Sequence, residues 1–156
     1  MLLIKKLIRV ILRFLKIRGQ YKIKNPYKIF TVADGNVFFG YYDKTPFSKD
    51  NTKILAHLYK GKISNIKKPL KIEIGYFDAK SMKFNRLDFS NTWCWQMGAR
   101  LMWHPTEPNT CIYNISNEKG YASRAMNVIT GDVEHEYDFP IYDLSPCGNY
   151  AASLNF

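Results

Sequence analysis

The chain repeats one short pattern three times: a strand-like run, a proline-containing turn and a second strand-like run. The copies are centred on Thr45-Pro46, His104-Pro105 and Ser145-Pro146, and their prolines lie 59 and 41 residues apart. Proline cannot donate a ladder hydrogen bond and therefore closes a strand, while Asp, Asn and Gly supply the turn. Strand-rich repeats of about 40 to 50 residues are typical of β-propeller blades. The repeat therefore predicts an all-β fold.

Further strand-like segments follow the first two copies, at 71–78, 83–87, 124–130 and 133–137. Each complete unit then has four strands, and four antiparallel strands form one propeller blade. We expect a partial β-propeller of about two and a half blades. These blades are expected at 37–89, 93–139 and, truncated, 140–156.

The first strand of the first blade is expected at Gly40–Pro46, where aromatic residues precede the proline. Propellers close with about four to eight blades, so this interpretation makes the chain the N-terminal piece of a longer protein. A small self-contained sheet protein is the alternative. The chain is 46% hydrophobic and 15% aromatic, which is sufficient for a folded core and argues against disorder.

The N-terminal segment differs from the rest, since residues 1–30 contribute +9 of the net charge of +10 and contain no Asp or Glu. Apolar residues recur there at helical spacing, and basic residues interrupt them every three or four positions. We therefore predict a basic amphipathic helix over 1–19, followed by a connector over 20–36. Such a helix lies on an anionic membrane surface through its cations. Those cations are Lys5, Lys6, Arg9, Arg13 and Lys16.

The alternative for this helix is packing on the domain, with its charges simply solvated. The interrupted apolar pattern fits neither a secretory signal nor a membrane-spanning helix. The other 126 residues hold 14 basic and 13 acidic side chains, so nucleic-acid binding is not expected.

Three cysteines occur without a CxxC pair, which indicates free buried thiols in a reducing compartment; they are Cys94, Cys111 and Cys147. Together with the basic helix, this favours a cytoplasmic protein peripheral to the inner membrane. The three histidines, His57, His104 and His135, have no ligand spacing. We expect no metal site and no cofactor.

In a propeller, the loops that lead into the innermost strands open on the face where ligands bind. In this chain those three loops combine aromatic rings with hydrogen-bonding groups, a combination that suits the apolar face and hydroxyls of a sugar ring. The candidate ligand-binding residues are Tyr41, Tyr42, Asp43, Lys44, Trp93, Trp95, Gln96, Arg100, Tyr142 and Asp143.

Other interpretations of these residues remain open. The aromatic residues could equally be packing signatures, and Trp103 is expected in the core. The two aspartates favour turn capping over catalysis. Gln96 and Arg100 are the stronger functional candidates, because long polar side chains on an inner strand require a partner. Both cations, Arg100 and Lys44, would also favour a uronic acid or a phosphate. General-base chemistry on a uronide by Tyr41 or Tyr42 is conceivable.

Three segments carry a resemblance: Phe-Phe-Gly-Tyr-Tyr-Asp-Lys-Thr-Pro-Phe-Ser at 38–48, Trp-Cys-Trp-Gln-Met-Gly-Ala-Arg-Leu-Met-Trp at 93–103, and the run from Pro140 to the last residue. They resemble a bacterial family found with capsule, O-antigen and other polysaccharide-biosynthesis proteins, and more broadly the TolB-like propellers, which include oligogalacturonate lyases. The resemblance implies a glycan or glycolipid partner, with polysaccharide-assembly proteins as further partners.

Some members of that family carry a glycosyltransferase label, but this chain has neither an alternating α/β pattern nor an Asp-x-Asp motif. The lyases hold a metal through residues of later blades, so none of those roles transfers to this chain. Three hypotheses follow: a glycan- or glycolipid-binding propeller, a lyase or hydrolase of acidic sugars, and a non-catalytic scaffold.

Overall fold

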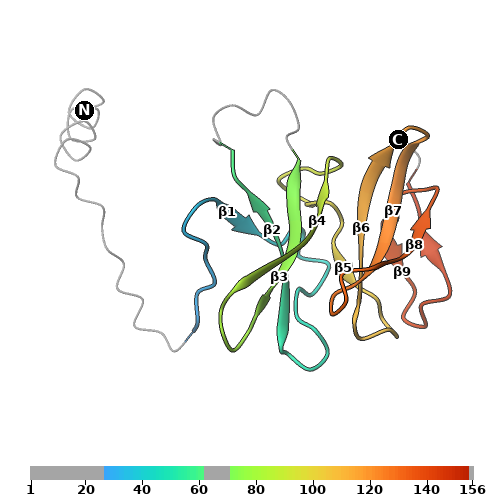
Figure 1. Ribbon diagram of the computed structural model, residues 1–156. Helices are drawn as coiled ribbons and strands as arrows, with labels where there is room; N and C mark the ends of the chain where they lie inside the picture. Colours follow the sequence, from blue (N-terminus) through green and yellow to red (C-terminus); the bar gives the residue numbers. More distant parts are fainter. Residues whose placement is uncertain (1–26, 62–70, 155–156) are drawn as a thin grey trace, which may run out of the picture.

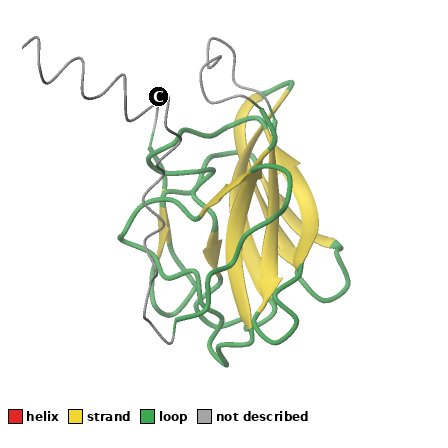
Figure 2. Cartoon of the chain, turned by 90° about the vertical axis from the view of Figure 1, so that its left-hand side faces the viewer, coloured by secondary structure: helices red, strands yellow, loops and turns green. Residues whose placement is uncertain are grey.

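The computed structural model describes residues 27–61 and 71–154 (Figure 1). Within these two ranges the chain forms ten β-strands. The same residues include no helix, and so none that is long and apolar enough to cross a membrane. Figure 2 shows strands joined by loops throughout. The all-β prediction is thus confirmed for this part of the chain, while the predicted helix at 1–19 lies outside the described residues.

Two four-stranded antiparallel sheets make up most of the described chain, each with its strands in sequence order. The first contains β1 (Asn36–Phe38), β2 (Lys53–Tyr59), β3 (Ile72–Asp78) and β4 (Phe84–Ser90). The second contains β5 (Met102–Trp103), β6 (Thr110–Asn117), β7 (Gly120–Asn127) and β8 (Val133–Tyr137). A two-stranded hairpin follows, with β9 (Asp143–Leu144) paired to β10 (Ala151–Ala152). In Figure 1 the second sheet lies between the first sheet and this hairpin.

The second sheet is covered on both faces because the side chains of β6 alternate between two cores. Cys111, Tyr113 and Ile115 belong to a buried cluster shared with β2 and β3 of the first sheet. Ile112, between them, belongs to a second cluster with Ile141 and the partly buried Leu144 of β9. Successive strand residues point to opposite faces, so a central strand can be apolar at almost every position.

The prediction of a first strand at Gly40–Pro46 is wrong. The first strand is β1, which ends at Phe38 and pairs with β2 in the register Phe38↔His57. Gly40 has a φ of 142°, and a Cβ there would lie 2.8 Å from the carbonyl oxygen of Met97. This close approach requires glycine and turns the chain out of the sheet. Residues 39–46 therefore form a loop between β1 and β2.

In its first copy, the repeat also has a register that differs from the one predicted from the sequence. The equivalent residues are Ser48, His104 and Ser145, because each backbone N–H donates to the carbonyl five or six residues later, at 2.9, 2.8 and 2.9 Å. The proline-centred sequence pattern instead predicts Thr45-Pro46 at this position. In the first copy the proline site is therefore occupied by Lys49. The equivalent residues are spaced 56 and 41 apart.

Two of these turns share further details that support this register. The hydroxyl oxygens of Ser48 and Ser145 each accept the backbone N–H five residues later, at 2.9 and 3.1 Å. Three residues after each serine stands a residue with positive φ, Asn51 at 58° and Gly148 at 76°. Asn and Gly are the residues that tolerate this backbone region. The turn chemistry, not the proline, defines the repeat.

Candidate functional site

The loops that lead into the three repeats meet at Arg100, whose side chain is only 6% exposed. Its Nη1 and Nη2 atoms donate to the two carboxylate oxygens of Asp43, at 3.3 and 2.9 Å. Its Nε and Nη2 atoms donate to the backbone carbonyl of Tyr142, at 3.1 and 2.6 Å. The guanidinium carbon also lies 4.0 Å from the centre of the Tyr142 ring. One side chain therefore ties together loops from all three repeats.

The backbone holds Arg100 in an unfavourable conformation, with a φ of 54°. Two residues earlier, Gly98 has a φ of 59°. The Arg100 N–H donates to the Met97 carbonyl at 3.3 Å. The intervening Ala99 carbonyl accepts the N–H of Asn114 in β6 at 2.7 Å. A left-handed conformation at a residue other than glycine persists only where the surroundings determine it. The fold thus fixes the direction of the guanidinium.

A second ion pair lies beside the first. Lys44, with a side chain 15% exposed, contacts a carboxylate oxygen of Asp143, whose side chain is 48% exposed. Burial alone would raise the pKa of Asp143, but the hydrogen bond from Lys44 and the N–H of Leu144 hold it below its usual value. We call Asp43, Lys44, Arg100, Tyr142 and Asp143 the three-loop cluster.

Within the three-loop cluster each cation is matched by a carboxylate. The charges of Arg100 and Lys44 are therefore paired with aspartates of the protein itself. This pairing does not favour the expectation that these two residues recruit a uronic acid or a phosphate. The N–H of Leu144 donates to the Asp143 carboxylate at 2.7 Å, so this aspartate also has the local capping contact that the sequence favoured.

Two tyrosines and an amide lie on the solvent side of this region. Tyr41 donates its hydroxyl hydrogen to the hydroxyl of Tyr42 at 3.0 Å, and the ring centres are 4.1 Å apart. This hydrogen bond, with burial and the nearby Tyr142 and Asp43, raises the pKa of Tyr41, while a hydrogen bond with Gln96 lowers it. The Tyr42 side chain is 85% exposed. Sequence-distant residues thus form one aromatic and polar surface.

Trp93 and Trp95 are mainly packing residues. Their rings meet edge to face at 5.1 Å, and both contact the ring of Tyr59, at 5.4 and 5.1 Å. Both also lie against Phe38 of β1. They belong to the margin of the first core, as does Trp103, whose indole N–H donates to the Pro46 carbonyl at 2.8 Å. The packing interpretation of the tryptophans therefore has direct structural support.

His57 supports the loop that carries Arg100, a role that no sequence pattern indicated. It is fully buried, and its Nε2 accepts the N–H of Ala99 at 3.0 Å. Its ring stacks on Phe38 with centres 5.1 Å apart. Burial lowers the pKa of His57 to about 4, against the opposing effect of the Phe39 and Phe38 backbone. An uncharged imidazole can act as the acceptor that this loop requires.

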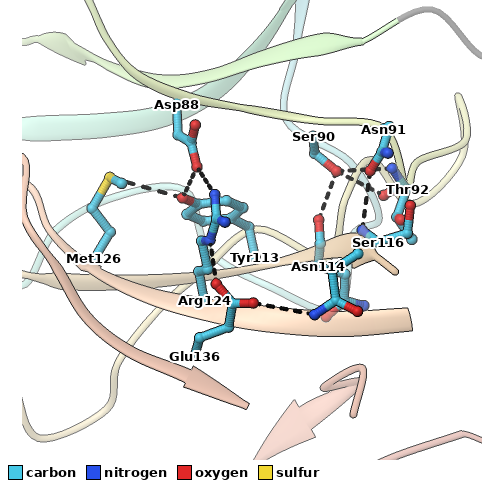
Figure 3. Close-up of polar contacts among 11 residues, drawn as sticks. Asp88, Ser90, Asn91, Thr92, Tyr113, Asn114, Ser116, Arg124, Met126 and Glu136 are labelled. Carbon is cyan, nitrogen blue, oxygen red and sulfur yellow. Dashed lines mark hydrogen bonds and ion pairs between the residues drawn. The ribbon is translucent and has the colours of Figure 1, made fainter. Parts of the chain in front are cut away.

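A polar network joins the two sheets (Figure 3). The hydroxyl of Tyr113 donates to Asp88 at 2.5 Å, and Arg124 donates to the same carboxylate oxygen at 3.0 Å. Arg124 also donates to Glu136 at 2.9 Å. Burial, followed by the hydrogen bond to Asp88, raises the pKa of Tyr113. The network fixes β4 against β6, β7 and β8 and is structural.

A pocket of about 360 Å³ lies on another side of the loop that carries Arg100. Its walls come from that loop, from β6 and β7, and from the segment before β9. Lining residues include Asn91, Thr92, Met97, Asn114, Tyr121 and Pro140. Of the candidate residues from sequence, Trp93 and Arg100 also line it. The rest were missed because no sequence pattern brings β6 and β7 next to residues 91–100.

All three cysteines are free, but only Cys111 is buried, and the expectation of buried thiols is wrong for Cys94 and Cys147. Burial raises the pKa of Cys111 to about 12, which keeps this thiol protonated. Across residues 27–61 and 71–154, no cluster of three or more His, Cys, Asp or Glu side chains could hold a metal ion.

The chain matches no protein-family model, no curated protein and no solved structure. The fold and the site themselves define its class. It is an antiparallel β protein of repeated four-stranded sheets, with an ion-paired cluster where three repeats meet.

Proposed function

We propose that the protein is a glycan-binding β-propeller protein, in which the two sheets and the hairpin are successive blades. Three features support the propeller. Each sheet is an antiparallel meander in sequence order. A separate core lies on each face of the second sheet. A related turn recurs between the first and second strands of each repeat. Blades that stack face to face around an axis have these properties.

One observation carries the glycan assignment: the loops that carry Asp43, Arg100 and Tyr142 converge and leave aromatic and amide groups at the solvent side. Tyr42 is 85% exposed, its ring lies against Tyr41, and Gln96 contacts the Tyr41 hydroxyl. An aromatic face packs on the C–H face of a sugar, and an amide exchanges hydrogen bonds with its hydroxyls. Arg100 acts here as the support that holds the loops.

The resemblance of residues 38–48, 93–103 and 140–156 to proteins of surface-polysaccharide biosynthesis supports a bacterial polysaccharide or its lipid-linked precursor as the ligand. The lyase alternative receives less support. A tyrosine base requires a lowered pKa, and the hydrogen bond to Tyr42 raises that of Tyr41. We expect no new unsaturated ends when uronide oligomers are incubated with the protein.

The binding test uses Tyr42→Ala and Gln96→Ala with capsule or O-antigen oligosaccharides, followed by isothermal titration calorimetry. Both side chains are exposed, so the circular dichroism spectrum should not change. Loss of one stacking contact should weaken binding about 3- to 10-fold. Tyr27→Ala is the matched control, because Tyr27 is 75% exposed and precedes β1. Unchanged affinity in both site variants, or an equal loss with Tyr27→Ala, would contradict the proposal.

A further inference from the structure

The 360 Å³ pocket beside Arg100 has a composition of its own. Its apolar part comes from Met97, Ala99, Pro140 and the rings of Trp93 and Tyr121. Tyr121 is 53% exposed, and so presents ring surface to solvent. Pockets that bind small organic molecules measure about 300 to 1,000 Å³ and combine apolar walls with a few polar groups. This pocket lies at the lower end of that range, as expected for one or two sugar rings.

Two asparagines, Asn91 and Asn114, line this pocket. The Asn91 side-chain oxygen accepts the N–H of Ser116 at 3.0 Å, and that of Asn114 accepts the N–H of Ile141 at 2.9 Å. A backbone N–H can only donate, so these contacts fix the orientation of both amides. No hydrogen bond among the described residues uses the Nδ2 group of either side chain. Figure 3 shows Asn91 and Asn114 in the group of polar contacts around Ser90, beside the inter-sheet network.

Thr92 adds an unsatisfied hydroxyl. Its Oγ1 atom is buried and has no hydrogen-bond partner. Its backbone is held in place by Ser90, whose hydroxyl accepts the Thr92 N–H at 3.0 Å and donates to the Asn114 carbonyl at 2.6 Å. A buried hydroxyl without a partner costs free energy, and this cost is recovered when the Thr92 side chain rotates to place its Oγ1 against a ligand hydroxyl.

The described residues of the pocket offer no free charge to a ligand. Among residues 27–61 and 71–154, Arg100 is the one charged residue that lines it, and its guanidinium is engaged by Asp43 and the Tyr142 carbonyl. An anionic sugar would therefore lose its hydration without gaining a cation. Amides, a hydroxyl and aromatic walls match a ligand with many hydroxyls and no charge.

We infer that this pocket binds an uncharged pyranose, as a subsite separate from the Tyr41–Tyr42 surface. Amide donors of Asn91 and Asn114 contact the sugar hydroxyls, as does the Thr92 hydroxyl after rotation of its side chain, while Tyr121 and Pro140 cover the C–H face of the sugar. The inference rests on the proposed function only in taking a glycan as the ligand. The class of sugar follows from the pocket itself.

Cys94 provides a reporter, because this free and exposed thiol lines the pocket. In a Cys147→Ser background, Cys94 is the one exposed cysteine among residues 27–61 and 71–154. The experiment measures the rate of Cys94 alkylation by iodoacetamide in the presence of maltotriose, N,N′,N″-triacetylchitotriose or trigalacturonate. We expect the two neutral trimers to slow the reaction and trigalacturonate to leave it unchanged. Binding is checked independently by saturation-transfer NMR.

Thr92→Val tests the contact, since it removes the hydroxyl and preserves the shape. We expect the variant to fold at least as well as the parent, because an unpaired buried hydroxyl is removed. The neutral trimers should bind about 3- to 10-fold more weakly, the effect of one hydrogen bond. Thr31→Val, at an exposed threonine before β1, is the matched control and should bind as the parent does.

Two results would overturn the inference: no protection of Cys94 by either neutral trimer, or protection by trigalacturonate as strong as theirs. The pocket inference and the proposed function can be refuted separately. If Tyr42→Ala weakens polysaccharide binding while Cys94 stays unprotected, the surface binds glycan and the pocket does not. If Cys94 is protected while Tyr42→Ala has no effect, the pocket inference stands without the surface.

Discussion

Acid should destabilise the protein through His57, which is buried between β1 and the loop that carries Arg100. Its neighbours are the Phe38 ring and the backbone of Gly98 and Ala99. Burial lowers the pKa of His57 from 6.5 to about 4. The unfolded chain therefore binds a proton below about pH 6.5, and the folded chain binds it only below about pH 4.

The sign follows from proton uptake on unfolding. Between about pH 6.5 and 4 the unfolded state holds more protons, so the free energy of unfolding decreases as the pH falls. Since one pKa unit equals about 1.36 kcal/mol, a pKa lowered from 6.5 to about 4 corresponds to about 3 kcal/mol. Domains are stable by about 5 to 15 kcal/mol, so this loss is large. Below about pH 4 the group contributes no further loss.

The assay is urea unfolding followed by tryptophan fluorescence at about pH 7, 6 and 5. His57→Gln is the informative variant, because its amide oxygen can accept the Ala99 N–H and does not titrate. We expect it to be less stable at neutral pH but to lose much less stability between pH 7 and 5. His135→Gln is the control at an exposed histidine and should keep the wild-type dependence.

Asp50 titrates at a lower pH than His57 and so does not obscure the range between about pH 6.5 and 4. The hydrogen bond from Ser48, with those of Thr52, lowers the pKa of Asp50 to about 2. Its stabilising effect is therefore lost as the pH falls below about 4 toward 2. If His57→Gln loses as much stability as the wild type between pH 7 and 5, the buried neutral histidine is not the cause, and the reasoning fails.

Three further substitutions test the supports of the site. Gly98→Ala should destabilise by at least about 2 kcal/mol, since φ is 59° and a Cβ would lie 2.2 Å from the His57 ring; a normal urea midpoint would contradict this. Arg100→Lys should cost about 2 kcal/mol by losing its bidentate contacts, and should release the β9–β10 hairpin to limited proteolysis; an equally resistant variant would refute this. Tyr113→Phe should cost about 1 to 3 kcal/mol because Asp88 loses a donor, with no loss of stability as the opposing result.

Much of the secondary structure followed from local sequence. The segments expected at 71–78, 83–87 and 133–137 correspond to β3, β4 and β8. Alternation and turn residues act over a few positions, so they are visible in the sequence. The first strand was misplaced because Gly40–Pro46 has strand-like composition, whereas its path depends on the contact between Gly40 and Met97, which is remote in sequence.

The sequence indicated polar and aromatic residues at three loops, but not the contacts that these residues make. Residues of the three loops do lie together, with Arg100 between Asp43 and Tyr142. The sequence could not show that Arg100 is saturated by these partners, or that the tryptophans pack on Tyr59. Whether a polar side chain is available to a ligand depends on which distant groups already bind it.

The sequence alone determined the β-class, the repeat and the residue types at the loops, because propensity and turn chemistry are local. Only the tertiary structure decided the repeat register at Ser48, the charge pairing of Arg100 and Lys44, and the burial of His57. It also decided the pocket, which requires β6, β7 and residues 91–100 to come together. Pairing, burial and cavities arise from contacts between residues far apart in the chain, which no local pattern encodes.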